Sequence, residues 1–348
     1  MTTSPSKTDP GRFFEDFRLG ETIRHATPRS VGAGERALYI GLTGSRFALQ
    51  SADSFARQLG LPSAPLDDIL VFNLVFGRSV PDVSLNAIAN LGYAEARFGV
   101  AVYDGDTLTA SSEVVGLKEN SNRETGVVYV RTTGLNQRGE TVLQFIRWVM
   151  VRKRDRLAPA PETSIPQLAS AVAAEDLSLP VGIDLSGYDA GLAGGPHLWD
   201  DYQPGEEIDH VDGMTIEESC HMTATRLYQN TARVHFNQHA ESGGRFGRRI
   251  VYGGHVISLA RALGFNGLAN AFRVAAINGG RHVNPCFAGD TVYAWTAVVD
   301  RITLPGRRDA GALRLKTVAT KNRPCGDFPT EGPDILLELD YTAILPRR

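Results

Sequence analysis

The sequence contains an internal repeat, which restricts the possible folds more than any other feature. Residues 13–25 read FFEDFRLGETIRH, and residues 198–210 read LWDDYQPGEEIDH, at an offset of 185 (198 − 13). Residues 103–107 (YDGDT) and 287–291 (FAGDT) match at an offset of 184 (289 − 105). Two collinear matching blocks that differ by a single indel indicate two copies of one structural module.

The repeat also predicts where the domains lie. The copies fall at about residues 1–152 and 197–348, which suits a chain of 348 residues at roughly 150 residues per domain. Between them, residues 153–196 are rich in Ala, Ser, Leu, Pro and Gly and show no sustained hydrophobic period. We therefore expect a linker there.

The composition excludes several classes of protein. Hydrophobic residues make up 42% and charged residues 22%, as in globular domains. The net charge of −3 argues against a nucleic-acid partner, which requires a surplus of basic residues. Three widely spaced cysteines indicate no disulfide framework, and neither a signal peptide nor a membrane span is visible. We expect a soluble, cytoplasmic protein without a membrane partner.

Each copy has the same order of predicted elements. An apolar helix is expected at residues 66–76 in the first copy and at 251–265 in the second. Strand-rich sequence follows, with strands predicted at 107–115, 126–132, 141–151 and 291–299. A buried helix followed by long antiparallel strands favours an α+β fold, in which a curved sheet wraps around the helix and two such sheets join edge to edge.

Longer stretches carry a resemblance to a known family. They are NLGY at 90–93, RWVMVRKR at 147–154, RLYQNTARVHFN at 226–237 and GRRIVYGGH at 247–255. With the predicted fold, they resemble the MaoC-like (R)-specific enoyl-CoA hydratases, as a tandem double hotdog, and among these the mesaconyl-CoA hydratases. The resemblance implies a hydro-lyase that interconverts mesaconyl-CoA and β-methylmalyl-CoA, with an acyl-CoA partner and no metal or redox cofactor.

The family's catalytic motif, Asp-x-Asn-Pro-[Ile/Leu/Val]-His, can be placed on the second copy. Its His falls on His235, its Asp falls on Asn230, and the glycine that begins the central helix falls on Gly253, with Gly254 beside it. The resemblance implies that the imidazole activates water, while amides at the helix start receive the enolate charge of the thioester oxygen.

The sequence departs from this motif at the acidic position. The amide of Asn230 does not titrate near neutral pH, so either His235 performs both proton transfers or a carboxylate comes from elsewhere. Asp67 and Asp68 are the candidates, because in related dehydratases the acidic partner crosses from the neighbouring hotdog. At an offset of 185 they match Tyr252 and Gly253.

The first copy is expected to be inactive. Ser45 and Gln50 occupy its Asp and His positions, and neither side chain can act as a base. We therefore expect one active site per chain.

Arginines near the predicted site are candidates for binding the free carboxylate of a C5 dicarboxylic acyl group. A guanidinium can form a bidentate contact with a carboxylate. The candidate substrate-binding residues are Arg46, Arg233, Arg248, Arg249 and Tyr252. For any single arginine the alternative is solvated surface charge.

Other histidines and arginines have structural interpretations. His25 and His210 are repeat partners beside a turn, and Arg97 and Arg281 share a repeat position that favours salt bridges. A metal site at His235 and His239 is disfavoured, because no acidic or cysteine pair lies nearby.

Two other functions stay open beside the hydro-lyase. One is an acyl-CoA thioesterase on the same fold, and the other is a non-catalytic acyl-CoA binding module. A homodimer is expected, since edge strands of hotdog sheets often pair again.

Overall fold

The structure is a computed structural model that describes residues 7–348, and most of its strands are long. The strands are β1 (Thr22–Ser30), β2 (Ala87–Phe98), β3 (Thr107–Glu119), β4 (Thr125–Leu135), β5 (Thr141–Arg152), β6 (Glu207–Asp209), β7 (Met214–Thr215), β8 (Arg273–His282), β9 (Thr291–Thr303), β10 (Ala310–Lys321) and β11 (Ile335–Pro346). They form one sheet in the order β1-β3-β4-β5-β2-β8-β11-β10-β9-β6, with β7 paired to β9.

The helices are mostly short. The longer ones are α1 (Ala33–Thr43), α4 (Asp68–Ser79), α6 (Glu218–Leu227) and α9 (Gly253–Leu263). The shorter ones are α2 (Ala48–Ser51), α3 (Asp53–Gln58), α5 (Ala190–Ala193), α7 (Arg233–Phe236), α8 (Gln238–Glu241) and α10 (Phe265–Leu268), with single turns η1 (Phe14–Asp16), η2 (Val80–Ser84), η3 (Ala174–Asp176), η4 (Leu185–Gly187) and η5 (Trp199–Asp201). No helix within residues 7–348 combines the length and the apolar character needed to cross a bilayer.

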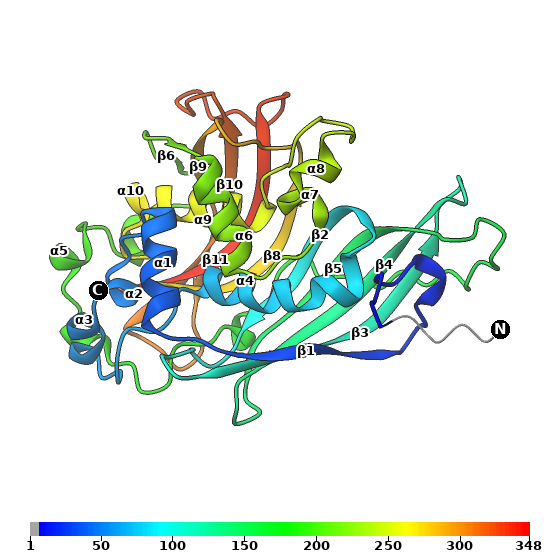
Figure 1. The fold of residues 1–348 in the computed structure, drawn as a ribbon. Coiled ribbons are helices and arrows are strands. Elements are labelled where there is room, and N and C mark those ends of the chain that lie inside the picture. The colour runs from blue at the N-terminus through cyan, green and yellow to red at the C-terminus, as the bar shows by residue number, and fades with distance from the viewer. Residues whose placement is uncertain (1–6) are drawn as a thin grey trace.

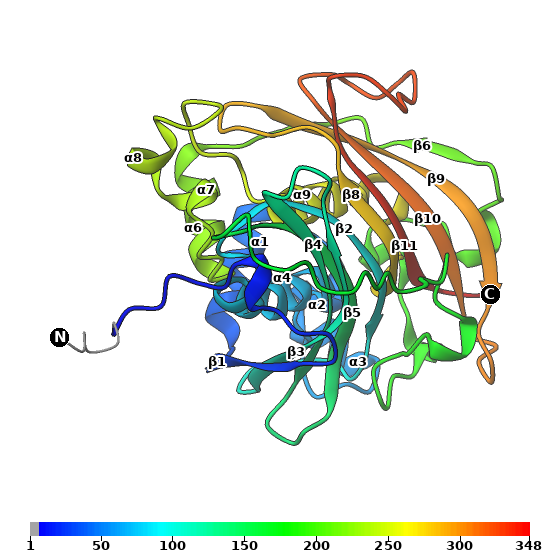
Figure 2. The same ribbon diagram turned by 90° about the vertical axis from the view of Figure 1, so that its right-hand side faces the viewer.

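The sheet is two curved sheets joined at one edge. β2 of the first copy pairs antiparallel with β8 of the second, for example Tyr93 with Gly280. The sheet curves around α4 and α9, which lie on its concave side (Figures 1 and 2). The helices α4 and α9 begin at residues 68 and 253, which are 185 positions apart, like the sequence repeat. The predicted double hotdog is confirmed.

The repeated histidines serve the fold of their own copies. His25 binds Asp82 through Nδ1 and the hydroxyl of Ser112 through Nε2, at 2.7 Å each. In the second copy His210 binds the carbonyl of Asn266 at 2.7 Å and the hydroxyl of Thr296 at 2.8 Å. Through its hydrogen bonds, each histidine ring therefore connects the start of its copy to the strand that follows the Gly-Asp-Thr turn.

The two central helices approach one another very closely. Asn73 of α4 donates from Nδ2 to the carbonyl of Gly254 (3.2 Å) and to the hydroxyl of Ser258 (3.1 Å) in α9. A Cβ atom on Gly254 would lie only 1.9 Å from Oδ1 of Asn73. Gly254 is therefore required for helix packing, and its predicted catalytic role stays a prediction.

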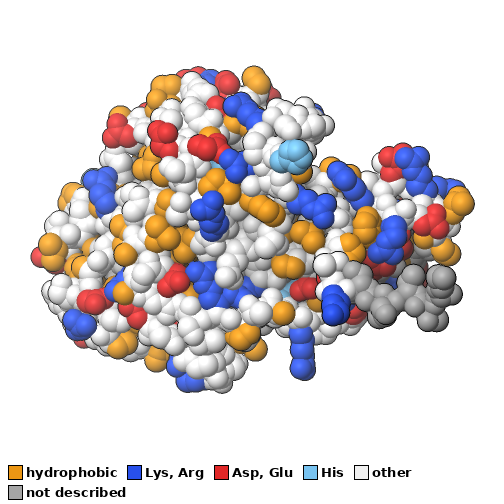
Figure 3. Space-filling model, viewed as in Figure 1, with side chains coloured by type: hydrophobic (Ala, Val, Ile, Leu, Met, Phe, Trp, Pro, Cys, Tyr) orange, Lys and Arg blue, Asp and Glu red, His pale blue; other side chains and the backbone are white. Residues whose placement is uncertain are grey.

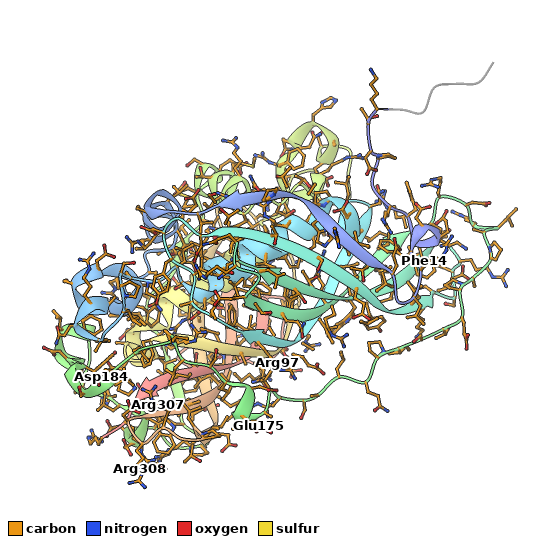
Figure 4. All side chains as sticks on the ribbon, turned by 90° about the horizontal axis from the view of Figure 1, so that it is seen from below. Phe14, Arg97, Glu175, Asp184, Arg307 and Arg308 are labelled. Carbon is orange, nitrogen blue, oxygen red and sulfur yellow. The ribbon has the colours of Figure 1, made fainter. Side chains whose placement is uncertain are left out.

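Residues 153–178 run along the outer side of the sheet, opposite the central helices (Figure 4). Residues 183–195 pack near α2, α3 and α10. Ser164 bridges to Leu117 in β3, and the amide of Ala169 donates to Glu95 in β2. Arg97 binds Asp176 at 3.1 Å. This segment is thus attached to strands of the sheet and contains only short helices.

A buried ion pair connects the two copies. Oδ1 of Asp68 accepts a hydrogen bond from Nη1 of Arg273 at 3.3 Å, and Oδ2 accepts one from the amide of Val274 at 2.9 Å. Both charged side chains are nearly inaccessible to solvent. Burial raises the pKa of Asp68 to about 6, so the carboxyl is ionised at pH 8.

We predict that Asp68→Asn lowers the free energy of unfolding by about 3 kcal/mol at pH 8, because the guanidinium of Arg273 stays buried without its counter-charge. Urea unfolding measures the change. Asp176→Asn, which removes a partner of the exposed ion pair with Arg97, serves as the control and is expected to cost less than about 1 kcal/mol. Equal losses in the two variants would contradict the assigned role of Asp68.

Candidate active site

One cavity lies where the two copies meet, and both supply its walls. Its volume is about 260 Å³. The first copy contributes from α4, η2, β2 and β5, and the second from residues 230–256, β8 and the segment after it. The polar side chains in the wall are Ser84, Asn90, Tyr93, Arg147, Asn230, His235, Tyr252, His282 and Asn284. No Asp or Glu is among the described residues of this wall.

His235 is held in a defined orientation by the backbone. Its Nδ1 lies 3.0 Å from the carbonyl oxygen of Ile250, which can only accept a hydrogen bond. The neutral ring therefore carries its proton on Nδ1, and Nε2 keeps a free lone pair. Burial lowers the pKa of His235 to about 4. The ring is thus neutral at physiological pH and can accept a proton at Nε2.

The N-terminus of α9 opens into the same cavity. Tyr252 is the residue before the helix and provides no side-chain cap, so the first amides of α9 have no acceptor within the helix. A Cβ atom on Gly253 would lie 2.4 Å from the ring of His282. Gly253 therefore brings an amide and the helix dipole to the cavity, which suits a developing negative charge.

The equivalent helix end in the first copy is occupied by its own side chains. Oδ1 of Asp67 accepts the amide of Ile69 at 2.8 Å and so caps α4. The carboxylate of Asp68 forms an ion pair with Arg273. Asp67 precedes Phe76, the nearest α4 residue in the cavity wall, by nine residues, or about 13 Å of helix. The structure thus argues against the prediction that either carboxylate is the proton donor.

The former motif positions of the first copy also have structural partners. Nε2 of Gln50, which occupies the His position, donates to the carbonyl of Phe272 at 2.6 Å. Ser45, at the Asp position, is buried, and its amide donates to the hydroxyl of Thr43 at 3.3 Å. These contacts give both residues a role in packing.

Asn230 lies in the cavity wall, as the motif predicts. Its Oδ1 accepts the amide of Ala232 at 3.0 Å, so the side chain is fixed by a local turn. The NH₂ group of Asn230 can therefore donate a hydrogen bond to a ligand. Such a group holds a water molecule by donation but does not exchange protons near neutral pH.

His282 and Tyr93 complete the cavity from the strands at the junction. Nε2 of His282 lies 3.0 Å from the hydroxyl of Tyr93. Burial lowers the pKa of His282 to about 4. This pair was not among the predicted site residues, although the repeat holds a signal for it: His282 stands where the first copy has Phe98, an apolar residue buried in the core.

The structure places the predicted carboxylate-binding arginines outside the cavity. Arg46 lies over the ring of Phe265 at 4.5 Å, and Arg248 lies over the ring of Phe287 at 4.0 Å. Arg249 and Arg233 are likewise absent from the described wall: Arg249 pairs with Glu218, and Arg233 is exposed. Basic side chains are common on the face seen in Figure 3, as expected for solvated charge. The arginine that does line the cavity is Arg147.

The fold and the cavity define a double hotdog with a histidine beside an open helix N-terminus. Among solved structures, the chain resembles a MaoC domain protein dehydratase from Chloroflexus aurantiacus, with a TM-score of 0.97, 61% identity and 99% coverage of both chains. A double-hotdog protein from Mycobacterium tuberculosis aligns with a TM-score of 0.76 and 25% identity, over 97% of this chain and 99% of that one.

Sequence comparisons specify the family. The family model for mesaconyl-CoA hydratase matches residues 4–326. The β-methylmalyl-CoA dehydratase of Chloroflexus aurantiacus is 62% identical over 99% of both chains. The mesaconyl-CoA hydratase of Cereibacter sphaeroides is 59% identical over 98% of this chain and 100% of that protein. The chain belongs to the mesaconyl-CoA hydratase family.

The tautomer and pKa of His235 lead to a spectroscopic prediction. In a histidine-labelled sample, long-range ¹H–¹⁵N spectra should show His235 as the neutral Nδ1–H tautomer from pH 8 down to pH 5.5, because burial disfavours the charged ring. The His235→Gln variant assigns the signal. A titration midpoint near the ordinary value of about 6.5 would contradict the assigned environment.

Proposed function

We propose that the protein catalyses the reversible hydration of mesaconyl-CoA to β-methylmalyl-CoA. The main support is the neutral His235 in one cavity with the uncapped N-terminus of α9. The chain also shares 62% and 59% identity with relatives named for these two compounds. Hydration of a conjugated thioester requires a base, a donor for the enolate oxygen and a proton source, and this cavity offers each of them.

In the proposed mechanism His235 performs both proton transfers. Its Nε2 removes a proton from water as the oxygen bonds to the β-carbon and the carbon–carbon π bond opens. The amide of Gly253 stabilises the charge on the thioester oxygen. The resulting imidazolium then gives its proton to the α-carbon, and Asn230 holds the water. This division of roles fits a wall in which the described residues include no carboxylate.

The size of the cavity supports an acyl-CoA bound only in part inside it. At about 260 Å³ the cavity suits the acyl end, and a second cavity of about 560 Å³ shares Asn230 with it. Arg78 and Arg226 line the second cavity. We propose that the CoA portion of the substrate extends along this side.

Several further properties belong to the proposal. The reaction is redox-neutral, so no cofactor is invoked beyond the CoA of the substrate. A cytoplasmic location is supported by three free cysteines. A homodimer is supported by exposed apolar side chains near the junction of the copies, with Ile88 50% and Val283 39% exposed. Light scattering on the purified protein tests the dimer.

One assay separates the proposed function from its alternatives. Purified protein is incubated with mesaconyl-CoA while enoyl absorbance and free thiol are followed together. Hydration removes absorbance without releasing thiol, a thioesterase releases thiol, and a binding module does neither. The thioesterase is disfavoured, because the described wall holds no carboxylate to activate water against the carbonyl.

We predict that His235→Ala lowers kcat for mesaconyl-CoA by about 10²–10⁴-fold, since the general base is removed. Circular dichroism should show an unchanged fold. His239→Ala is the matched control, because His239 lies four residues further on and is exposed. Activity that survives in the His235 variant would remove this residue from the mechanism.

We predict that Asn230→Asp keeps kcat/KM at pH 8 within about tenfold and moves its acid limb to higher pH. A carboxylate beside His235 would favour the imidazolium and so raise the pKa of the ring. A pH–rate profile measures the shift. Loss of all activity in a folded variant would instead show that the NH₂ group of Asn230 is indispensable.

A further inference from the structure

Arg147 is a buried cation that forms no ion pair with any described residue of the chain. It lies in β5, is 0% exposed and is the only Lys or Arg among the described residues of the cavity wall. Nη1 donates to Ser84 at 3.2 Å and Nη2 donates to Ser79 at 2.8 Å. The guanidinium also lies 4.2 Å from the ring centroid of Phe76. All these partners are neutral.

The missing counter-charge is unusual for a buried guanidinium. Within residues 7–348 no Asp or Glu forms an ion pair with Arg147. Burial lowers the pKa of Arg147 to about 10, so the side chain is still protonated at neutral pH. A buried charge normally has a paired partner, because desolvation without one is costly. The Nε group of Arg147 has no hydrogen-bond partner either.

Two neighbouring side chains in the same wall also lack hydrogen-bond partners. The hydroxyl of Tyr252 is buried and has no hydrogen-bond partner, and neither polar atom of the Asn90 amide has one. Burial keeps the pKa of Tyr252 well above its usual range, so the phenol stays protonated and can donate. A guanidinium without a counter-charge, with its Nε unpartnered, lies in one wall with a phenol and an amide that lack hydrogen-bond partners, and together they form a site suited to a carboxylate.

We propose that Arg147, with Tyr252 and Asn90, binds the free carboxylate of the acyl group and so selects dicarboxylic over uncharged enoyl-CoA substrates. This inference rests on the proposed function. In mesaconyl-CoA the free carboxylate is attached to the carbon that water attacks, so its binding site must lie close to the base. The ring of Tyr252 lies 5.5 Å from the ring of His235, as this requires.

The position of the carboxylate in the substrate also has a chemical consequence. Water that approaches as a partial hydroxide would be repelled by the carboxylate attached to the carbon it attacks. Pairing that carboxylate with a fixed guanidinium removes the repulsion and orients the β-carbon toward the water. Arg147 is therefore a specificity and positioning residue, and His235 remains the proton-transfer group.

The test compares two substrates in two variants. Tiglyl-CoA carries a methyl group where mesaconyl-CoA carries the carboxylate. We expect Arg147→Met to lower kcat/KM for mesaconyl-CoA by about 10³-fold or more, since the site loses its charged donor. The value for tiglyl-CoA should change by less than about tenfold. Arg131→Met, at an exposed ion pair with Glu113 in the same half, is the matched control and should leave both values unchanged.

Stability and ligand binding give independent readouts. Because the free enzyme buries an unpaired charge, Arg147→Met should raise the midpoint of thermal unfolding, whereas a purely structural arginine would lower it. Free mesaconate should raise this midpoint in the wild type and not in the variant. If the Arg147 variant does not fold, Tyr252→Phe removes only a hydroxyl and should show the same selective loss on mesaconyl-CoA.

The outcomes separate this inference from the proposed function. Equal losses of kcat/KM on both substrates in the Arg147 variant would overturn the carboxylate site. If Tyr252→Phe is used in its place, equal losses in that variant would do the same. A wild type that leaves mesaconyl-CoA unchanged would refute the proposed function, and the mesaconate shift would then decide the carboxylate site by itself. Absence of that shift in the wild type would overturn it.

Discussion

The close contact between α4 and α9 is the constraint on which the rest of the structure depends. Two apolar helices can share the concave side of one sheet only if their backbones approach closely, and Gly254 against Asn73 permits this. The contact brings the C-terminal end of α4, with Phe76, to the open N-terminus of α9. The cavity is the space left between these helix ends and the strands at the junction, so neither copy could form it alone.

The two copies share a backbone plan but differ in electrostatics. At the start of α4 the side chain of Asp67 takes the place that a ligand oxygen could occupy, whereas the start of α9 has no side-chain cap. The first copy supplies Tyr93 and Arg147 to the cavity, and the second copy supplies His235.

The cavity combines a neutral base with a buried cation and excludes carboxylates from its described wall. Burial disfavours charge on His235, which keeps the ring able to accept a proton, and the guanidinium of Arg147 contributes to a positive potential. Such a site favours an anionic substrate and the anionic enolate formed from it. An aspartate at position 230 would oppose both, which gives a physical reason for an amide there.

The sequence by itself predicted the two modules and the histidine that lines the cavity. The repeat predicted the double hotdog, since hydrophobic pattern and turn chemistry are local, and the motif spacing placed His235, Asn230 and Gly253, all of which line the cavity. Only the tertiary structure decided which charged groups meet there. Arg147 stands among apolar residues of β5 whose inward direction depends on strand pairing, and His282 reaches the site through the junction of β2 with β8. Spacing along a chain cannot reveal such contacts, because they arise between segments that fold together from distant positions.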